Sequence, residues 1–262
     1  MSEEPEDQNE PEREAPHGPR VSRWAFFRSV GGALISVVLC GGLAALLLAM
    51  FHPDTPLPNG WNPTTSLVVD DDVTPLTSWK LRAALNDPVQ CVAVLGSAAQ
   101  MRPLDPFEQD ENCHIRNRVT LAGVGGARID DVETSCATAL RVAMWEQHGI
   151  QPAARDILGT QVRTIRQIGS YNCRPIRTIQ GPSNRWSTHS TGDAIDITGF
   201  DFEDGTRVRL IDDWDPTGPK SDFLKAVRDS ACTWFATTLS PDYNSLHADH
   251  FHLQARGWGT CR

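Results

Sequence analysis

Two short segments in the C-terminal third of the 262-residue chain concentrate residue types that bind metal ions. They are residues 187–196 (STHSTGDAID) and residues 247–252 (HADHFH). His189, Asp196 and His252 supply two imidazoles and a carboxylate, a set that suits zinc and leaves a fourth coordination position open for chemistry. Asp196 is also flanked by apolar residues, where a carboxylate is costly unless it is paired or bound to metal. These residues predict a mononuclear catalytic zinc site; the alternative is a structural hydrogen bond between His189 and Asp196.

A second histidine lies two residues before His252. Side chains alternate between the two faces of a strand, so His250 and His252 are expected to project to the same face of a strand over residues 250–255. One of them then binds the metal, while the other stands beside a water whose pKa zinc lowers to about 7. The pair therefore predicts one ligand and one base.

Residues 187–196 match the pattern S-x-H-x-x-G-x-A-x-D at every fixed position. This pattern resembles that of the zinc D-Ala-D-Ala carboxypeptidases and murein endopeptidases, whose fold is shared with lysostaphin-type peptidases and the hedgehog signalling domain. The resemblance implies that His189, Asp196 and His252 bind Zn²⁺. In that group the last ligand follows either E-x-x-H or H-x-H, and the second form makes His250 the expected base.

The resemblance also suggests residues that act on a substrate. Asp249 occupies the Glu place of the E-x-x-H form with a shorter carboxylate, and it is a second candidate for a catalytic role. Arg174 stands where the group carries a substrate-facing arginine, so it is expected to hold a peptide carboxylate or to stabilise an oxyanion. A surface or salt-bridging arginine is the alternative. Ser187 and His247 are further candidates for substrate contact, and His247 also fits a loop position beside the ligands.

A closer resemblance covers the whole globular part, about residues 88–262. Residues 169–174 (GSYNCR), 231–232 (AC) and 239–244 (LSPDYN), together with the two metal-binding segments, resemble the bacterial extensin-like C-terminal domain family. Nothing in the chain resembles the proline-rich repeats of plant extensins. A structural wall protein of the plant kind is therefore not expected.

Residues 29–51 contain no charged side chain. They are long enough to cross a bilayer as a helix, which takes about 20 residues. Four arginines precede this segment, whereas the first basic residue after it is Lys80. The positive-inside rule therefore predicts a single-pass anchor in the bacterial inner membrane, with a cytoplasmic N-terminus and a periplasmic C-terminal domain. A cleaved signal peptide is the alternative, but the apolar stretch is long for one and no clear A-x-A site follows it.

Six cysteines are spread over the chain after residue 51, and none forms a C-x-x-C pair. An even number of scattered cysteines favours three disulfides in an oxidising compartment, which agrees with the predicted orientation. Buried free thiols are the alternative. The sequence does not decide the connectivity; we expect neighbours to pair, as Cys91–Cys113, Cys136–Cys173 and Cys232–Cys261.

The chain divides into four predicted regions. Residues 1–28 form a disordered cytoplasmic segment because they have little apolar content to bury. The anchor of residues 29–51 follows, then a Pro- and Asp-rich stalk over residues 52–77 and the zinc domain over residues 78–262.

Hydrophobic patterning in the last region predicts an α+β fold with a small antiparallel sheet and flanking helices. The resemblance adds that this fold is like that of the D-Ala-D-Ala metallopeptidases and the hedgehog domain. The expected helices are residues 79–85, 136–147, a segment from 151, and 222–239. The expected strands are residues 118–124, 161–171, 194–202, 207–211 and 250–255.

The formal net charge of −9 and the lack of a sustained basic patch argue against a nucleic-acid partner. The predicted function is a membrane-anchored extracytoplasmic zinc metallopeptidase that acts on peptidoglycan peptides, as a carboxypeptidase or an endopeptidase. The alternative is a metal-containing cell-wall binding or scaffold domain without turnover. The histidine pair favours catalysis, because a structural site would not need His250.

Overall fold

A computed structural model describes the backbone of residues 23–52, 55 and 57–262, and the side chains from residue 31 onward in these ranges. The chain divides into two compact units between residues 55 and 56. Of the segment expected to be disordered, residues 1–22 lie outside the described residues.

The first unit contains helix α1, Arg23–Phe51. Its part Gly31–Phe51 is long and apolar enough to cross a membrane by length and composition, although a signal sequence near an N-terminus has the same properties. The helix begins at Arg23 rather than at residue 29, so residues 23–28 extend the helix. The thiol of Cys40 in this helix is free and exposed.

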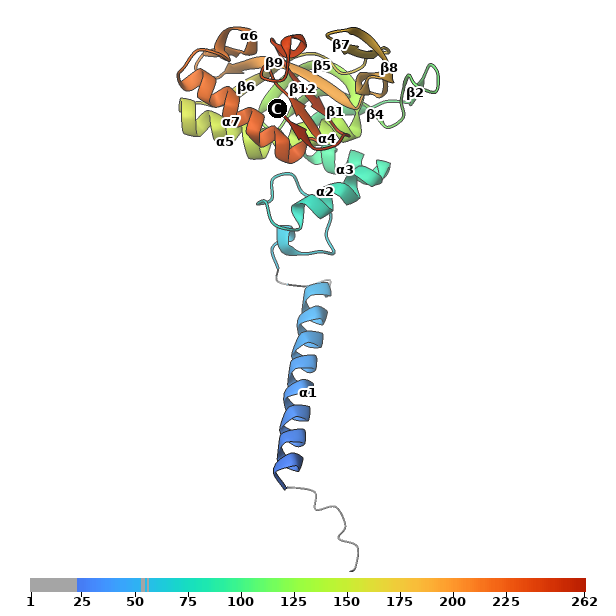
Figure 1. Cartoon of the computed structure of the whole chain (residues 1–262), viewed down its shortest axis with the longest axis vertical. Coiled ribbons are helices and arrows are strands. Elements are labelled where there is room, and N and C mark those ends of the chain that lie inside the picture. Colours follow the sequence, from blue (N-terminus) through green and yellow to red (C-terminus); the bar gives the residue numbers. More distant parts are fainter. Residues whose placement is uncertain (1–22, 53–54, 56) are drawn as a thin grey trace, which may run out of the picture. The chain divides into compact units, whose positions relative to one another are not determined.

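The second unit is built on a mixed sheet of nine strands (Figure 1). The strands are β1 (Ala99–Pro103), β4 (Arg118–Val124), β5 (Ala127–Ser135), β6 (Val162–Gly169), β9 (Ala194–Phe202), β10 (Arg207–Arg209), β11 (Thr237–Leu239), β12 (Phe251–Gln254) and β13 (Thr260–Cys261). Their order is β1-β4-β5-β6-β9-β12-β11-β13, and β10 pairs with β9. Two separate hairpins complete the strands: β2 (Phe107–Glu108) with β3 (His114–Ile115), and β7 (Pro175–Thr178) with β8 (Gly181–Trp186).

The α+β class is confirmed, but the sheet is large where a small one was expected, and it is mixed and not purely antiparallel. β6 runs parallel to β5, and β13 runs parallel to β11. The first of these parallel pairs has a simple cause, because a helical crossover joins β5 to β6 and brings the chain back to the same end of the sheet.

The helices of the second unit are α2 (Thr77–Asn86), α3 (Pro88–Ala98), α4 (Cys136–Trp145), α5 (Gln151–Ala153), α6 (Leu210–Asp213) and α7 (Pro219–Trp234). A π-helical turn at 146–150 joins α4 to α5, and a second one at 154–158 extends α5, so residues 136–158 form one rod where two helices were expected. The expected helix 222–239 ends early, because residues 237–239 leave it to pair with β12 as β11.

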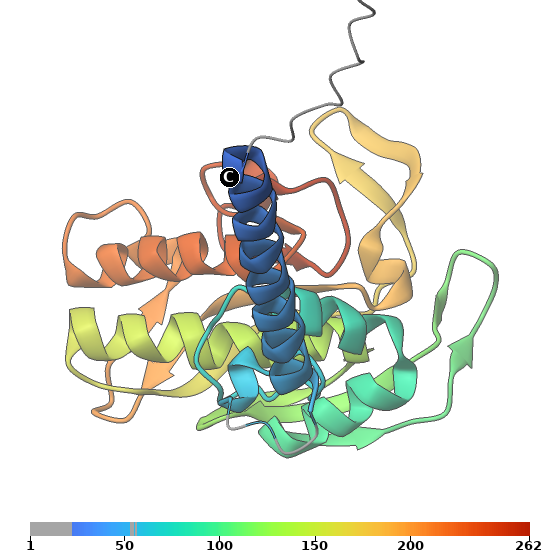
Figure 2. The same ribbon diagram turned by 90° about the horizontal axis from the view of Figure 1, so that it is seen from below.

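One face of the sheet carries the hydrophobic core beneath two helical elements. The rod 136–158 and α7 lie side by side over the sheet (Figure 2). Trp145 of the rod meets Phe200 of β9 edge-on, with ring centroids 6.2 Å apart. Phe223 of α7 meets the same Phe200 edge-on at 5.3 Å. Both helical elements therefore cover the face of β9 to which Phe200 points.

Strand β9 changes the direction of its side chains at a β-bulge. Thr198 is an extra residue on β9 in the pairing with β6. Ile197 and Phe200 both belong to the core, whereas strict alternation would place them on opposite faces. The bulge shifts the alternation by one residue, so that Ile197 and Phe200 both face the core. Asp196 and Asp201 lie on the face away from the core.

The segment expected as a stalk is in part folded onto the second unit. Leu67 and Val69 are buried in the core. Nε2 of His148 in the helical rod lies 2.7 Å from the carbonyl oxygen of Val69. The folded unit therefore includes residues that precede Ser78.

Three disulfides form in the second unit, as the six scattered cysteines predict. They are Cys91–Cys136, Cys113–Cys173 and Cys232–Cys261. The third pair was expected, but the expected pairs Cys91–Cys113 and Cys136–Cys173 are wrong. Helix α3 packs against α4 and brings Cys91 next to Cys136 across 45 residues of sequence. Neighbour pairing fails because packing of distant elements, and not chain distance, decides the partner.

Candidate metal centre

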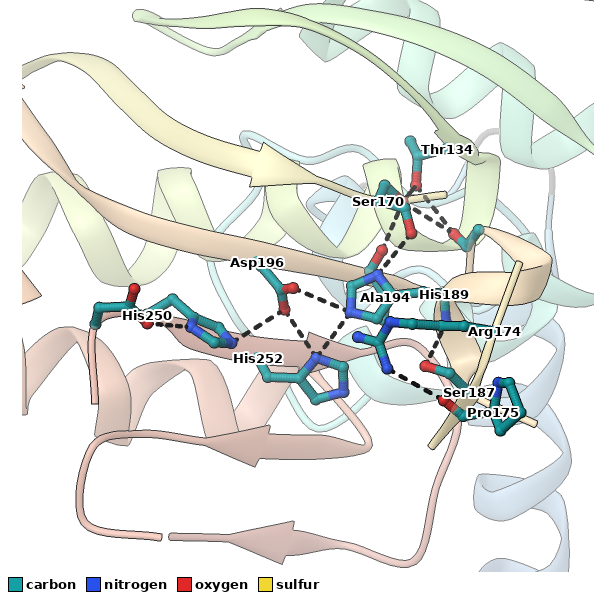
Figure 3. A network of polar contacts seen from close by, with 12 residues as sticks. Thr134, Ser170, Arg174, Pro175, Ser187, His189, Ala194, Asp196, His250 and His252 are labelled. Atoms are coloured by element: carbon teal, nitrogen blue, oxygen red, sulfur yellow. Dashed lines mark hydrogen bonds and ion pairs between the residues drawn. The ribbon is translucent and has the colours of Figure 1, made fainter. Parts of the chain in front are cut away.

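Three polar side chains meet at strands β9 and β12 (Figure 3). Nε2 of His189 lies 3.1 Å from Oδ2 of Asp196 and 3.1 Å from Nδ1 of His252. Nδ1 of His252 lies 2.8 Å from Oδ1 of Asp196. Two ligand atoms that bind one tetrahedral zinc ion are roughly 3.3 Å apart. The three predicted ligands are thus brought together with nearly the spacing that a single zinc ion requires.

Asp196 and His252 come from neighbouring strands. In the antiparallel pairing of β9 with β12 they are direct partners. Directly opposite residues share one face of the sheet and lie close enough to interact. Phe251 and Leu253, on either side of His252, belong to the core, so the imidazole points away from it.

His189 lies in a 3₁₀ turn, Thr188–Thr191, that precedes β9. Ser187 caps this turn, because its hydroxyl accepts the backbone N–H of His189 at 3.3 Å. Gly192 ends the turn with a left-handed φ of +64°. The Ser and the Gly of the sequence pattern therefore shape the turn that presents His189.

The carbonyl of Ser170 determines the tautomer of His189. Nδ1 of His189 lies 2.7 Å from this oxygen, which can only accept, so Nδ1 carries the proton. In the neutral imidazole, Nε2 then carries the lone pair that a metal ion would use, and this nitrogen is the one that lies next to Asp196 and His252. A partner of this kind is typical of histidines that bind metals. Sequence reasoning did not assign Ser170 a role, although residues 169–174 stand out as a motif.

The charge states at the cluster suit a metal. Burial alone would raise the pKa of Asp196, but the hydrogen bonds and charges of His189 and His252 outweigh burial and hold this pKa far below its usual range. Burial lowers the pKa of His252 by more than the hydrogen bond and charge of Asp196 raise it. An ionised carboxylate and a neutral imidazole are the forms that bind metal.

His250 lies next to this cluster with one ring nitrogen turned toward it (Figure 3). Its Nδ1 is 2.7 Å from Oδ1 of Asp249, and its Nε2 is 3.7 Å from Oδ1 of Asp196. When Nδ1–H donates to Asp249, Nε2 keeps a free lone pair on the side of the cluster. The geometry therefore gives Asp249 the task of orienting His250.

His247 forms part of the wall around the ligands. Its ring lies 5.3 Å from the ring of His250 and 5.7 Å from that of His252. Its Nδ1 lies 2.8 Å from Oδ1 of Asn244. Burial, followed by the charges of His252 and His250, lowers the pKa of His247 to about 4, so the ring is neutral at neutral pH. Tyr243, which sequence reasoning missed, packs edge-on against His247 at 5.5 Å.

The two remaining predicted substrate contacts have different surroundings. Ser187 is buried, and its hydroxyl is used by the turn of His189. Arg174 is half-buried, its Nη1 donates to the carbonyl of Pro175 at 3.3 Å, and its buried Nε has no partner among the described residues. Burial and then the charge of Arg177 lower the pKa of Arg174, whereas Asp196 raises it. The guanidinium of Arg174 is therefore within electrostatic reach of the cluster.

Two contacts hold the loop that carries Arg174 in place, one directly before the other in the sequence. The backbone N–H of Asn172 donates to the carbonyl of His189 at 3.0 Å. The next residue, Cys173, forms a disulfide with Cys113.

Asp110 lies within 4.8 Å of these two sulfurs. This second group is not a metal site, because disulfide sulfurs are not thiolate ligands.

All of these site residues lie within one region that matches a known family. The model of the extensin-like protein C-terminus matches residues 89–262, about two thirds of the chain. The chain belongs to the extensin-like C-terminal family. No curated protein and no solved structure matches it. The family match begins after α2, whereas the folded unit of this extensin-like protein also contains Leu67 and Val69 in its core.

Proposed function

We propose that this extensin-like protein is a zinc-dependent hydrolase that cuts peptide bonds of peptidoglycan. The observation that carries the proposal is the convergence of His189, Asp196 and His252, with the imidazole of His250 beside them. Three protein ligands are typical of catalytic zinc sites, whereas structural sites are closed by four. The pattern of residues 187–196 supports a fold and chemistry related to those of the D-Ala-D-Ala metallopeptidases and the hedgehog domain.

Zinc held by three protein ligands supplies a Lewis acid that polarises a carbonyl and lowers the pKa of water. His250 accepts a proton from the attacking water at Nε2 and delivers it to the leaving amine. Asp249 keeps Nδ1 of His250 protonated, so Nε2 stays available for this transfer. Nη2 of Arg174 makes no hydrogen bond among the described residues, so it can donate to an oxygen of the substrate.

The proposed location is the periplasmic side of the bacterial inner membrane. Helix α1 supplies an apolar segment of sufficient length, and four arginines precede this segment in the sequence. The three disulfides of the second unit support an oxidising compartment. Peptidoglycan lies on that side of the membrane, within reach of an anchored domain.

The metal is tested first, on the full-length protein in detergent. Elemental analysis is expected to find about one zinc per chain in the wild type and in His250→Ala, and none in Asp196→Asn. Asp193→Asn is the matched control, because Asp193 pairs with Arg256 at 3.0 Å and not with the cluster. A wild-type protein that folds without binding zinc would remove the proposal.

Hydrolysis of purified muropeptides is measured on the same samples. His250→Ala should lower kcat/KM by about 10²–10⁴ while its zinc content stays unchanged. Equal activity of His250→Ala and wild type would contradict the role of His250 as the base. A zinc-loaded wild type that leaves every muropeptide intact would favour a non-catalytic cell-wall binding or scaffold domain.

A further inference from the structure

The β7–β8 hairpin is attached to the metal centre at both of its ends. Its two strands, Pro175–Thr178 and Gly181–Trp186, pair with each other and stand apart from the main sheet. Arg174 directly precedes the first strand. Ser187, which caps the turn of His189, directly follows the second strand. A ligand that lies on the hairpin is therefore next to the site of the proposed chemistry.

The hairpin and its base carry positive charge without acidic partners. Arg174, Arg177 and Arg185 take part in none of the ion pairs of the described residues. Arg177 and Arg185 are exposed, and the charge of Arg177 reaches Arg174. In a chain with a net charge of −9, these arginines form a local positive region beside the metal centre. Such a region attracts an anionic group of a ligand.

Apolar side chains accompany this charge on the hairpin. Trp186 is 43% exposed and is the cross-strand partner of Pro175. Ile179, in the turn between the two strands, is 66% exposed. A peptide with a carboxylate fits this combination, because its backbone and aliphatic groups pack on an aromatic ring while its charge meets an arginine.

We propose that the β7–β8 hairpin is a substrate-recognition element in which Arg177 binds a carboxylate of the peptide, separate from the group held by Arg174. This inference rests on the proposed function and narrows its substrate class to peptides with a free carboxylate away from the bond that is cut. A guanidinium binds a carboxylate through charge-assisted, often bidentate hydrogen bonds, which an amide does not replace. Amidation of that carboxylate should therefore weaken the peptide as a ligand and as a substrate.

The test uses the full-length, zinc-loaded protein and a synthetic stem pentapeptide. Versions of the pentapeptide in which the carboxyl groups are amidated one at a time are the comparison ligands. The hairpin variant is Arg177→Gln. The matched control is Arg102→Gln, which removes another exposed arginine that takes part in no ion pair of the described residues. Calorimetry measures binding, and product analysis measures cleavage separately.

The wild type is expected to bind the free-acid peptide about tenfold or more tightly than one of the amidated versions. The hairpin variant should bind the free-acid peptide and this amidated version equally, with the affinity that the wild type has for the amidated version. The control variant should bind both peptides as the wild type does. The zinc content should be the same in all three proteins. The proposal is overturned if amidation of each carboxyl group changes the affinity of the wild type and of the hairpin variant by the same factor. If discrimination is present in binding but no peptide is cut, the hydrolase proposal fails while the recognition role stands.

Discussion

At the scale of single residues, the metal centre depends on backbone shape as much as on ligand identity. The carbonyl of Gly192 accepts the hydroxyls of Thr134 at 3.0 Å and Thr138 at 2.9 Å. A Cβ at Gly192 would lie 3.1 Å from the backbone nitrogen of Ser135. A glycine is needed there both for its left-handed φ and for this close approach, and the turn it ends holds His189.

Replacement of Gly192 by alanine should therefore cost more than backbone strain alone. Gly159 is the matched control, because its φ of +68° is similar but a Cβ there would meet open space. We expect Gly159→Ala to lower the free energy of unfolding by about 1 kcal/mol, and Gly192→Ala to lower it further and to weaken zinc binding. Urea unfolding and zinc competition measure the two effects. Equal losses in both variants would show that the contact with Ser135 has no energetic role.

At the scale of elements, Asp201 joins three strands on the face of the sheet away from the core. Its carboxylate accepts Nη2 of Arg166 in β6 and Nη2 of Arg209 in β10, each at 2.5 Å. Burial alone would raise the pKa of Asp201, but the hydrogen bonds and charges of the two arginines outweigh burial and lower it below its ordinary value. The ionised carboxylate is therefore favoured by folding.

Asp201→Asn should lower the free energy of unfolding at neutral pH by about 2 kcal/mol, because the side chain is only 6% exposed and accepts two charged donors. The folded-state pKa lies below the unfolded-state value of about 4, so the stabilisation is complete above that value. It is lost as the pH falls through the folded-state pKa. Urea unfolding of both proteins over a series of pH values should show a difference that shrinks in acid. A difference that does not change with pH would contradict this role.

At the scale of the whole molecule, the folded unit extends beyond the region that the family model matches. Nζ of Lys80 donates to the carbonyl of Asn59 at 2.6 Å and to the hydroxyl of Thr65 at 2.9 Å. Leu67 and Val69 bury their side chains in the same core as the extensin-like domain. The segment from residue 57 to α2 therefore contributes to the stability of the domain that carries the metal centre.

A fragment of residues 57–262 should accordingly be more stable than one of residues 78–262. The shorter fragment loses two buried apolar side chains, each of which contributes about 1.5–3 kcal/mol, and it leaves the buried Lys80 without its two partners. Thermal and urea unfolding of the two fragments measure the difference. If both unfold at the same denaturant concentration, the segment contributes no stability and behaves as a stalk.

Several elements were predicted correctly because their signals are local. Strands β4 and β9 have the expected bounds, since alternation over a few residues is enough to recognise a strand. Helix α4 begins at residue 136 as expected, where Ser135 caps it, because a cap depends only on the residues that follow it. The ligand candidates were found in the same way, from residue types and spacing within two short segments.

The sequence by itself therefore determined the residue chemistry of the candidate site and only part of the strands and helices; strands such as β1 and β5 and helix α3 were not expected. Only the tertiary structure decided the partners: Ser170 for His189, Cys136 for Cys91, and β12 for the residues that leave α7. Each of these contacts joins segments that are far apart in the chain, and no local pattern records which distant segment will pack against another. The bulge at Thr198 belongs to the same class, because it is defined by the pairing of β9 with β6 and is what places Phe200 on the same face as Ile197.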